Sequence, residues 1–507
     1  MNGTDARVVV VGAGNAALCA ALAAREYGAD VRVLEWAPEA ERGGNSAYTG
    51  GVMRVAYDSV EDLLEIMPDL TEAEVRRADF GRYPASQLYE DIARLGEYQG
   101  DSELIDMIAS RSRETLMWMR SQGVRFVPAY GAQAFELEGQ FVFWGGLSVE
   151  VSGGGRGLVE SLVRAAERGG IDIHYRTRAI SLRHEDGRVV GVRAIQDGEY
   201  LDYPADAVVL GCGGFESNAQ WRAQYLGPGW DLAKVRGTRF NYGDGIRMAL
   251  DVGAQPYGHW SGCHAVGWDR NAPATGDLSV GDGYQKHSYP LGIMVNARGE
   301  RFVDEGADFR NYTYAEYGRR VLMQPGRFAW QVFDAKAIPL LRDEYRIRQV
   351  TKVTANSLEE LADRLEGVDR AGFLRTVRDF NAAVTTAAFN PAILDGRRTE
   401  GISPPKSNWA NPISDPPFEA YAVTCGITFT FGGLRIDSSA RVLDCSGQPV
   451  SGLFACGELV GGIFFMNYPG GSGLTAGAVL GRTAGAAAAA GRSLVGDLAD
   501  GMRKLTD

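Results

Sequence analysis

Two glycines and an alanine near the N-terminus have the spacing of a phosphate-binding turn. Gly12, Gly14 and Ala17 form G-x-G-x-x-A directly after the apolar run Val8–Val11. Gly12 allows a tight turn, Gly14 lets the backbone approach a pyrophosphate, and Ala17 keeps helix and strand close. Glu35 follows about 20 residues later, where a carboxylate accepts hydrogen bonds from ribose hydroxyls. We therefore expect these residues to bind a dinucleotide.

The elements that must hold these residues form a strand–helix–strand unit. Val8–Val11 is β-branched and apolar, as in a buried parallel strand. Ala16–Tyr27 is rich in alanine and leucine and predicts a helix that Gly28 ends, and Val31–Leu34 predicts the second strand. The helix N-terminus offers free N–H groups and a positive dipole end to phosphates. The complete unit favours dinucleotide binding over a turn that binds nothing.

Three further glycine-rich segments follow predicted strands or precede a helix. The loop Arg42–Gly51 carries two glycine pairs, which can lie flat against a planar ligand or form a mobile surface loop. The apolar strand Ala207–Leu210 runs into Gly211–Gly214, and glycines after a strand let a backbone approach a ligand. Gly457–Thr475 precedes an Ala/Gly-rich helix, whose small residues suit either cofactor contact or tight packing.

Composition excludes several classes of protein. The chain has 507 residues, 45% of them hydrophobic, and a formal net charge of −12, which argues against a nucleic-acid partner. Its six cysteines are scattered without a C-x-x-C pair, so we expect no metal site. The first predicted strand starts near Arg7, so we expect no signal peptide. No stretch of about 20 apolar residues lacks breakers, so we expect no membrane span, and the scattered cysteines fit a cytoplasmic protein best.

Taken together, the four segments resemble the flavoprotein subunits of the succinate dehydrogenase and fumarate reductase superfamily, and the resemblance covers nearly the whole chain. It implies an α/β fold: a Rossmann-type FAD-binding domain with an inserted α+β capping domain, and substrate at their junction. Composition also changes after about Trp260. We therefore expect residues 1–260 and 417–507 to form the FAD-binding domain and residues 261–416 to form the capping domain.

The resemblance also assigns parts of FAD to segments of this chain. In that family the first loop holds the pyrophosphate, Glu35 the adenosine ribose, Glu458 the ribityl chain, and the backbone at Leu474–Thr475 the flavin pyrimidine edge. It implies FAD contacts for Gly12, Gly14, Asn15, Ala16, Ala17, Glu35, Trp36, Arg42, Gly43, Gly44, Asn45, Ser46, Thr49, Gly50, Gly51, Ala179, Gly213, Gly214, Asn241, Asp244, Gly457, Glu458, Ser472, Gly473, Leu474 and Thr475.

Some stretches are more specific. GNAALCAALAARE, RGGNS, GGFESN, RGTRFN, ERFVDEG, TEG and GITFT are similar to the tricarballylate dehydrogenase branch, and NYPGGSGLTAG looks like the 3-ketosteroid dehydrogenase branch. Membrane-bound members tether FAD through a histidine in the loop before Gly50. Here Gly44, Asn45 and Ser46 occupy that region, which implies non-covalent FAD. Fumarate reductases have an arginine in the last motif to clamp a carboxylate, and Tyr468 falls there.

The family reaction forms or breaks a C–C double bond next to a carbonyl. A base takes the proton α to the carbonyl and flavin N5 takes the β hydride, so the site must also stabilise enolate charge. In the ketosteroid branch, the tyrosine of the matching segment and a nearby backbone N–H hydrogen-bond the substrate ketone. The resemblance therefore implies that Tyr468 is such a donor; packing on the flavin is its alternative role.

Histidines and threonines supply further candidates by position. His264 follows the Gly243–Gly245 motif at a distance similar to a substrate-binding histidine of the fumarate reductases, and it suits carboxylate binding, a proton shuttle or a structural role. His287 is a candidate from its place in the cap. Thr428 and Thr430 fall where family members carry carboxylate-binding side chains, although their alternating neighbours also suit a simple strand.

Arginines could pair with a substrate carboxylate through two parallel hydrogen bonds. Arg301 matches a family position within Asn296–Phe302, although a structural bridge to the acidic residues that follow is equally compatible. The proton-donating arginine of the fumarate reductases comes shortly after this motif. Phe309 stands at its expected place and Arg310 is one residue further on.

We therefore expect an FAD-dependent dehydrogenase that introduces a C=C bond α,β to a carbonyl in a small carboxylate or cyclic oxo-carboxylate. The alternatives are an enoate or fumarate-type reductase, a 3-ketosteroid-type 1-dehydrogenase, and a non-catalytic flavoprotein that acts as a binding module. No second dinucleotide fingerprint is present, so direct nicotinamide use is not expected. The electron acceptor, whether oxygen, a quinone or an electron carrier, stays open.

Overall fold

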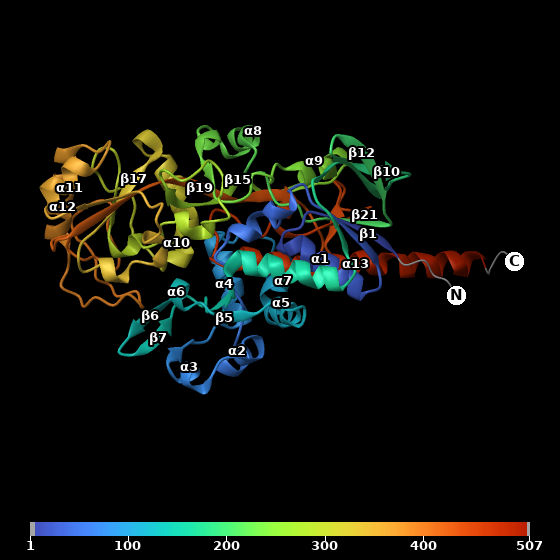
Figure 1. Cartoon of the computed structure of the whole chain (residues 1–507), viewed down its shortest axis with the longest axis horizontal. Coiled ribbons are helices and arrows are strands. Elements are labelled where there is room, and N and C mark those ends of the chain that lie inside the picture. The colour runs from blue at the N-terminus through green and yellow to red at the C-terminus, as the bar shows by residue number, and fades with distance from the viewer. Residues whose placement is uncertain (1–5, 504–507) are drawn as a thin grey trace.

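The computed structural model describes residues 6–503, and a nine-stranded sheet lies at its right in Figure 1. The sheet order is β10-β11-β21-β13-β1-β2-β9, with β12 added to β11 and β20 to β21. Strand β1 pairs in parallel with β13 and β2, as the strand–helix–strand unit requires. The strands are β1 (Arg7–Val11), β2 (Asp30–Leu34), β9 (Asp172–His174), β10 (Thr177–Glu185), β11 (Arg188–Gln196), β12 (Glu199–Pro204), β13 (Ala207–Leu210), β20 (Arg441–Leu443) and β21 (Pro449–Ala455).

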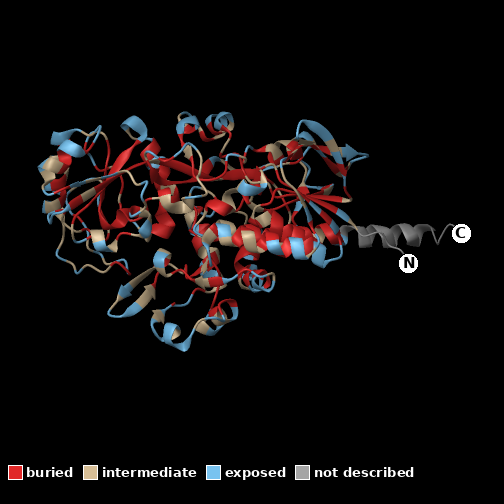
Figure 2. Ribbon diagram, viewed as in Figure 1, coloured by how far each residue is buried: buried red, intermediate tan, exposed pale blue. Residues whose placement is uncertain are grey.

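Three helices run side by side along this sheet: α1 (Asn15–Glu26), α7 (Gly154–Arg168) and α13 (Ser472–Arg503) (Figure 1). Glycines let α13 approach α1 closely, because a β-carbon at Gly481 or Gly485 would lie 2.3 or 2.0 Å from a backbone oxygen of α1. Val8, Val9, Val10 and Val11 are buried, as expected of a strand covered on both faces. Figure 2 shows this buried layer in red.

A six-stranded sheet forms the other end of the molecule. Its order is β14-β19-β17-β16, with β15 and β18 both paired to β19. Strand β19 pairs with strands of this sheet, although the domain prediction places it in the second part of the FAD-binding domain. The domain boundaries stay a prediction. The strands are β14 (Lys234–Val235), β15 (Pro256–Asp269), β16 (Ile293–Val295), β17 (Ala329–Phe333), β18 (Lys352–Ala355) and β19 (Phe418–Leu434).

Helices and small sheets complete the molecule. Around the six-stranded sheet lie α10 (Arg310–Leu322), α11 (Leu358–Arg364) and α12 (Arg370–Ala383), and α9 (Asp244–Asp251) packs on β10. The lower part of Figure 1 holds the helices α2 (Val60–Ile66), α3 (Glu72–Arg76), α4 (Ala85–Leu95), α5 (Ser102–Ser121) and α6 (Tyr130–Gln133). One three-stranded sheet consists of β3 (Val52–Met53), β5 (Phe126–Pro128) and β8 (Val149–Val151). The other consists of β4 (Ala78–Asp79), β6 (Ala134–Leu137) and β7 (Gln140–Phe143). The predicted α/β fold class is confirmed.

Candidate active site

One cavity brings the predicted segments together. Its empty volume is about 1760 Å³, part of it open to solvent. It runs from the carboxyl ends of β1 and β2 to the six-stranded sheet, where ligands of open α/β sheets bind. Five predicted catalytic residues line it: Tyr468, His264, His287, Arg310 and Thr428. So do 20 predicted FAD residues: Gly12, Gly14, Asn15, Ala16, Glu35, Trp36, Gly44, Asn45, Ser46, Thr49, Gly50, Gly51, Ala179, Gly213, Asn241, Asp244, Gly457, Glu458, Gly473 and Leu474.

The Glu35 end of the cavity is built around a buried carboxylate. Glu35 accepts hydrogen bonds of 2.7 Å from the backbone N–H groups of Ala13 and Ala37, which ties the end of β2 to the glycine turn. Burial raises the pKa of Glu35, although these N–H groups favour its charged form. Next to it, Arg178 lies over the Trp36 ring at 4.0 Å and pairs with Asp244 at 2.8 Å. Sequence reasoning missed Arg178, which belongs to no motif.

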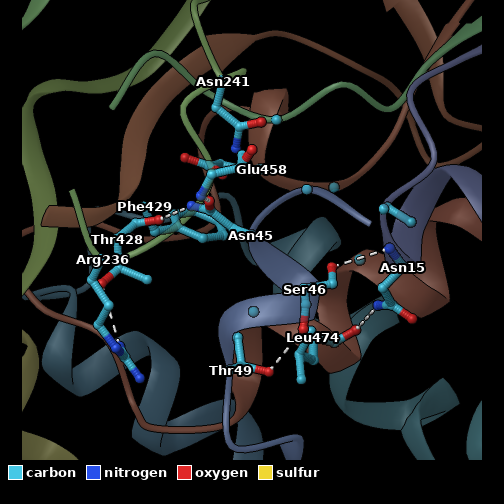
Figure 3. Close-up of a pocket in the computed structure, with 18 of the residues that line it drawn as sticks. Asn15, Asn45, Ser46, Thr49, Arg236, Asn241, Thr428, Phe429, Glu458 and Leu474 are labelled. Atoms are coloured by element: carbon cyan, nitrogen blue, oxygen red, sulfur yellow. Dashed lines mark hydrogen bonds between the residues drawn. The ribbon is translucent and has the colours of Figure 1, made fainter. Parts of the chain in front are cut away.

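The loop after β2 connects the glycine turn to distant segments (Figure 3). Ser46 Oγ accepts a hydrogen bond of 3.1 Å from the backbone N–H of Asn15, and the Asn15 side chain donates to the Leu474 carbonyl at 2.8 Å. Asn45 Nδ2 donates to the Thr428 carbonyl and to the Glu216 carboxyl, each at 2.6 Å. These bonds join three of the glycine-rich segments, and Gly12 lies against the fourth, since a β-carbon there would come within 2.6 Å of the Gly211 carbonyl oxygen.

Two neighbouring carboxyl groups lie near the middle of the cavity, that of Glu458 in its lining and that of Glu216 behind it. Glu458 lines it and accepts a hydrogen bond of 2.8 Å from the backbone N–H of Thr430. Glu216 accepts hydrogen bonds from Asn45 and, at 2.5 Å, from Asn241. Burial raises the pKa of Glu458 to about 6, and burial together with the neighbouring Glu458 charge raises that of Glu216 well above its usual value. Of the two carboxyl groups, Glu216 is therefore the one more readily protonated. Sequence reasoning did not single it out, although it lies in the stretch GGFESN.

The other end of the cavity is a polar and aromatic chamber. The His264 ring stacks on the Tyr468 ring at 4.7 Å, and the Tyr314 ring lies 4.9 Å from His264 and 4.8 Å from His287. His287 Nδ1 is 3.2 Å from a guanidinium nitrogen of Arg310. These five side chains come from β15, α10 and the segments around residues 287 and 468. Tyr314, on the second turn of α10, was not predicted.

The ionisation of this chamber follows from burial. Burial, followed by the charge of Arg236, lowers the pKa of His264 well below its usual value, and burial and Arg310 lower that of His287. Burial raises the pKa of Tyr468 to about 12 despite a hydrogen bond of 2.7 Å that its oxygen accepts from the Gly473 N–H. Both histidines are therefore neutral and Tyr468 is a neutral phenol near pH 7.

Charged side chains that were not predicted line the same chamber. Arg236 makes two hydrogen bonds to Asp282, at 2.7 and 2.8 Å, and its guanidinium also approaches Thr428 Oγ1 at 3.3 Å (Figure 3). Arg342 and Glu344 line the cavity from the loop that precedes β18. Arg236 begins the stretch RGTRFN and could have been found from it, whereas Asp282, Arg342 and Glu344 belong to no local motif.

Two predicted catalytic residues lie outside the cavity lining. Arg301 is buried and makes a two-point ion pair with Glu305, at 3.1 and 2.5 Å, and it also donates to backbone carbonyls near Pro404. It is thus a structural bridge, one of the two roles that the sequence leaves open. Thr430 is fully buried, and its hydroxyl lies 3.2 Å from Glu458. Thr430 therefore lies outside the cavity lining and contacts Glu458.

Six of the predicted FAD residues also do not line the cavity: Ala17, Arg42, Gly43, Gly214, Ser472 and Thr475. Ala17 packs against Gly211, which is the close helix–strand contact that its small size permits. Arg42 pairs with Glu39 at 2.9 Å. Gly43 packs against α7, where a β-carbon would approach a valine side chain to 2.7 Å. These residues shape the wall from outside.

The remaining three are held by buried neighbours. A β-carbon at Gly214 would lie 2.3 Å from a Glu458 oxygen, so this glycine makes room for the carboxyl pair. Thr475 is fully buried and donates to the Arg54 carbonyl at 2.7 Å. Ser472 is fully buried at the first position of α13.

The cavity wall fits a large phosphorylated cofactor. A β-carbon at Gly14 or Gly50 would have its nearest neighbour only at 3.5 Å, so these glycines present open backbone to the cavity. Helix α1 begins after Gly14, which provides no side-chain cap, and apart from the Asn15 N–H that donates to Ser46 its positive end faces the cavity. His264 Nε2 and His287 Nε2 are buried and have no hydrogen-bond partner among the described residues, as expected of groups that face a ligand.

Comparison with known proteins identifies the cofactor. A family model described as "FAD binding domain" matches residues 7–474. The chain belongs to this FAD-binding family. The flavoprotein is 29% identical to a probable fumarate reductase, Ifc3, of Shewanella frigidimarina, over 94% of this chain and 74% of that protein. It is 28% identical to 4-oxocyclohexanecarboxylate 2-dehydrogenase of Sinomonas cyclohexanicum, over 97% and 93%.

Solved structures show the same fold. A 3-ketosteroid delta1-dehydrogenase from Sterolibacterium denitrificans superposes with a TM-score of 0.73 at 22% identity, covering 96% of this chain and 99% of that one. The predicted superfamily, the FAD cofactor and the enzyme class, an FAD-dependent oxidoreductase acting on CH–CH bonds, are thus confirmed.

Two properties concern the described residues alone. None of the helices in the described part of the chain has the length and apolar character needed to cross a bilayer. No three His, Cys, Asp or Glu side chains within residues 6–490 gather in a way that could hold a metal ion.

Proposed function

We propose that this flavoprotein is a dehydrogenase that introduces a C=C bond next to the carbonyl of a small oxo-carboxylate. The observation that carries the proposal is the chamber itself. It places a phenol donor, Tyr468, beside an uncharged histidine, His264, with guanidinium groups further along the wall. The relative named 4-oxocyclohexanecarboxylate 2-dehydrogenase, which aligns over nearly its whole length, supports both the oxidative direction and the substrate class.

Each residue of the chamber has its own role in the proposed reaction. Bound FAD supplies the two-electron redox chemistry. Tyr468 donates its hydroxyl proton to the substrate carbonyl, and the Gly473 N–H stabilises negative charge on the phenol oxygen while it does so. The predicted amide donor thus acts through the tyrosine in this geometry. His264 is neutral and its buried Nε2 is unpartnered among the described residues, so it can accept the proton α to the carbonyl.

The cofactor segments keep the roles that the resemblance implies. The glycine turn and the start of α1 hold the pyrophosphate, Glu35 the ribose, Glu458 the ribityl chain and Leu474 the pyrimidine edge. FAD is held without a covalent bond, since Gly44, Asn45 and Ser46 stand where the membrane-bound members of the superfamily carry the histidine that tethers FAD.

The reverse reaction is the second candidate, because the relatives include a protein named as a probable fumarate reductase. An anaerobic titration followed by visible spectroscopy separates the two. We expect 4-oxocyclohexanecarboxylate to bleach the oxidised flavin, and tricarballylate and succinate to bleach it less. If no saturated acid bleaches the flavin but an enoate reoxidises the dithionite-reduced protein, the enzyme is a reductase. If neither happens with any carbonyl compound, the proposed activity is wrong.

A further inference from the structure

Two arginines of the chamber have no acidic partner. Arg310 is buried at the start of α10 and Arg342 lies in the loop before β18, and both line the cavity. Arg342 Nη1 donates to the Gly131 carbonyl at 2.6 Å, and Arg310 Nη2 donates to the Ala132 carbonyl. Among the residues that the structure describes, neither has a carboxylate oxygen within 4.0 Å. Two cations held only by neutral groups are prepared to receive an anion.

The surroundings of these arginines carry further unmet polar groups. Both guanidinium carbons lie near the Trp144 ring, at 5.7 Å for Arg310 and 5.9 Å for Arg342. Arg310 Nε is buried and has no partner within the described structure, and the same holds for Gln133 Oε1 and Asn311 Oδ1, whose residues line the cavity beside it. An unpartnered guanidinium N–H in a cavity wall indicates a ligand that accepts its hydrogen bond.

The charges at this end of the cavity specify how many anionic groups fit. Three guanidinium groups line it, those of Arg236, Arg310 and Arg342, against the two carboxylates of Asp282 and Glu344, which leaves one net positive charge. The Arg236–Asp282 pair is closed by two hydrogen bonds. Glu344 is the acidic group that Arg310 and Arg342 face, and its Oε1 is unpartnered among the described residues. One carboxylate neutralises the chamber, whereas a second would be buried without a cation.

Tyr314 contacts both the neighbour of the carbonyl donor and the neighbour of the anion pocket. Its ring lies 4.9 Å from that of His264, which stacks on Tyr468, and 4.8 Å from that of His287, which contacts Arg310. A substrate that reaches both Tyr468 and Arg310 must carry its carbonyl and its carboxylate on different parts of the molecule, as the 1,4-positions of a six-membered ring do.

We propose that Arg310 and Arg342 bind the single carboxylate of a monoanionic oxo-acid and that Glu344 excludes di- and tricarboxylates. The link to a reacting carbonyl rests on the proposed function, but the binding of a monoanion does not. Redox-inert aromatic probes therefore test the pocket separately: benzoate as the monoanion, benzamide as its uncharged match, and terephthalate as the dianion.

Calorimetric titration of the FAD-loaded protein measures these affinities. We expect benzoate to bind at least about 10-fold more tightly than benzamide, because charge-assisted hydrogen bonds are the stronger ones. We expect the same preference over terephthalate, whose second carboxylate would be buried without a cation. Arg342→Gln should weaken benzoate binding by about 10-fold or more and change benzamide binding by less than about twofold. Arg346→Gln, an exposed arginine of the same loop that pairs with Asp343, is the matched control and should change neither.

A second variant tests the sign of the exclusion. Glu344→Gln adds one net positive charge to the chamber, so terephthalate should bind more tightly than to the wild type while benzamide stays unchanged. The proposal is overturned if terephthalate binds the wild type as tightly as benzoate, or if Arg342→Gln weakens benzoate and benzamide equally. Because none of the probes is oxidised, these results stand whether or not an oxo-acid bleaches the flavin.

Discussion

At the scale of single residues, Tyr468 has one hydrogen bond through its oxygen and a proton left for a ligand. Its oxygen accepts from Gly473, and its ring stacks on His264. Tyr468→Phe keeps the ring and removes the donor. We expect the rate of anaerobic flavin reduction to fall by about 100-fold, since loss of one oxyanion donor costs about that much. Stopped-flow absorbance measures it.

The flavin content of Tyr468→Phe should match that of the wild type. Tyr200→Phe, at an exposed tyrosine on β12, serves as the control that should leave the rate unchanged. Normal turnover by Tyr468→Phe would remove the donor role and leave packing as the function of this ring.

The neutrality of His264 predicts a pH effect on stability. The folded protein keeps this histidine uncharged because burial and then Arg236 lower its pKa, whereas the unfolded chain protonates it below about pH 6.5. The wild type therefore loses stability relative to His264→Gln as the pH falls. We expect the difference in free energy of unfolding to shift by about 1.4 kcal/mol between pH 7.5 and pH 5.5.

Urea unfolding of both proteins at the two pH values measures this difference. An unchanged difference between wild type and His264→Gln would mean that His264 binds protons equally in the folded and the unfolded chain, so that burial does not lower its pKa.

At the scale of elements, the turn between β1 and α1 has two glycines with different roles, one in the fold and one in cofactor binding. Gly12 has φ +102° and a β-carbon there would lie 2.6 Å from the Gly211 carbonyl oxygen, so Gly12→Ala should destabilise the fold by about 1–3 kcal/mol. Gly14 has φ −78° and its nearest neighbour would be at 3.5 Å, so Gly14→Ala should fold normally. The methyl group then occupies the space where the backbone meets the pyrophosphate.

Flavin content and urea unfolding separate the two effects. Gly14→Ala should retain less than about a tenth of the wild-type FAD after dialysis, with an unchanged stability of the FAD-free protein. Gly28→Ala, where no atom lies within 4 Å of the added carbon, controls for a positive-φ glycine far from the cofactor. Full FAD retention by Gly14→Ala would place the pyrophosphate elsewhere.

A bulge in β19 explains why two similar threonines have different surroundings. Pairing with β15 passes from His264–Phe429 directly to Ala265–Ile427, so Thr428 is the extra residue of the bulge. Without it, Thr428 and Thr430 would share one face of the strand, because side chains alternate with a period of two. With it, Thr428 lines the cavity and Thr430 contacts Glu458.

At the scale of the whole molecule, the cavity joins both sheets, so a ligand that fills it should stabilise the whole chain. FAD at 100 times its Kd adds about 2.7 kcal/mol to the free energy of unfolding. FMN lacks the part that Glu35, Trp36 and Arg178 would contact. We therefore expect FAD to raise the Tm of the apoprotein by more than an equal concentration of FMN does. Thermal unfolding followed by circular dichroism compares them.

Acid precipitation of the holoprotein should release all of the flavin, as non-covalent binding requires. Flavin that stays with the precipitate would show a covalent bond. Equal stabilisation by FMN and FAD would mean that the Glu35 end does not bind the nucleotide.

The sequence by itself determined the local parts of this protein. The run Val8–Val11, the glycine turn and Glu35 predict a strand–helix–strand unit, because period, turn geometry and helix ends depend on residues close together in the chain. The order of the four glycine-rich segments was sufficient to predict the family and FAD. Positions matched to the family, and for His287 its place in the cap, also indicated Tyr468, His264, His287 and Arg310, all of which line the cavity.

Only the tertiary structure decided which charged groups face the cavity. Arg301 and Arg310 are nine residues apart, yet Glu305 pairs with the first and the second is left without an acidic partner among the described residues. Glu216 and Arg236 lie in the stretches GGFESN and RGTRFN, which do not show what surrounds them, and Arg342 follows no local pattern. The neighbours of all three are brought to them by segments distant in the chain. The electrostatics of a buried group depends on what surrounds it in space, so its charge and role are set when the two sheets pack together.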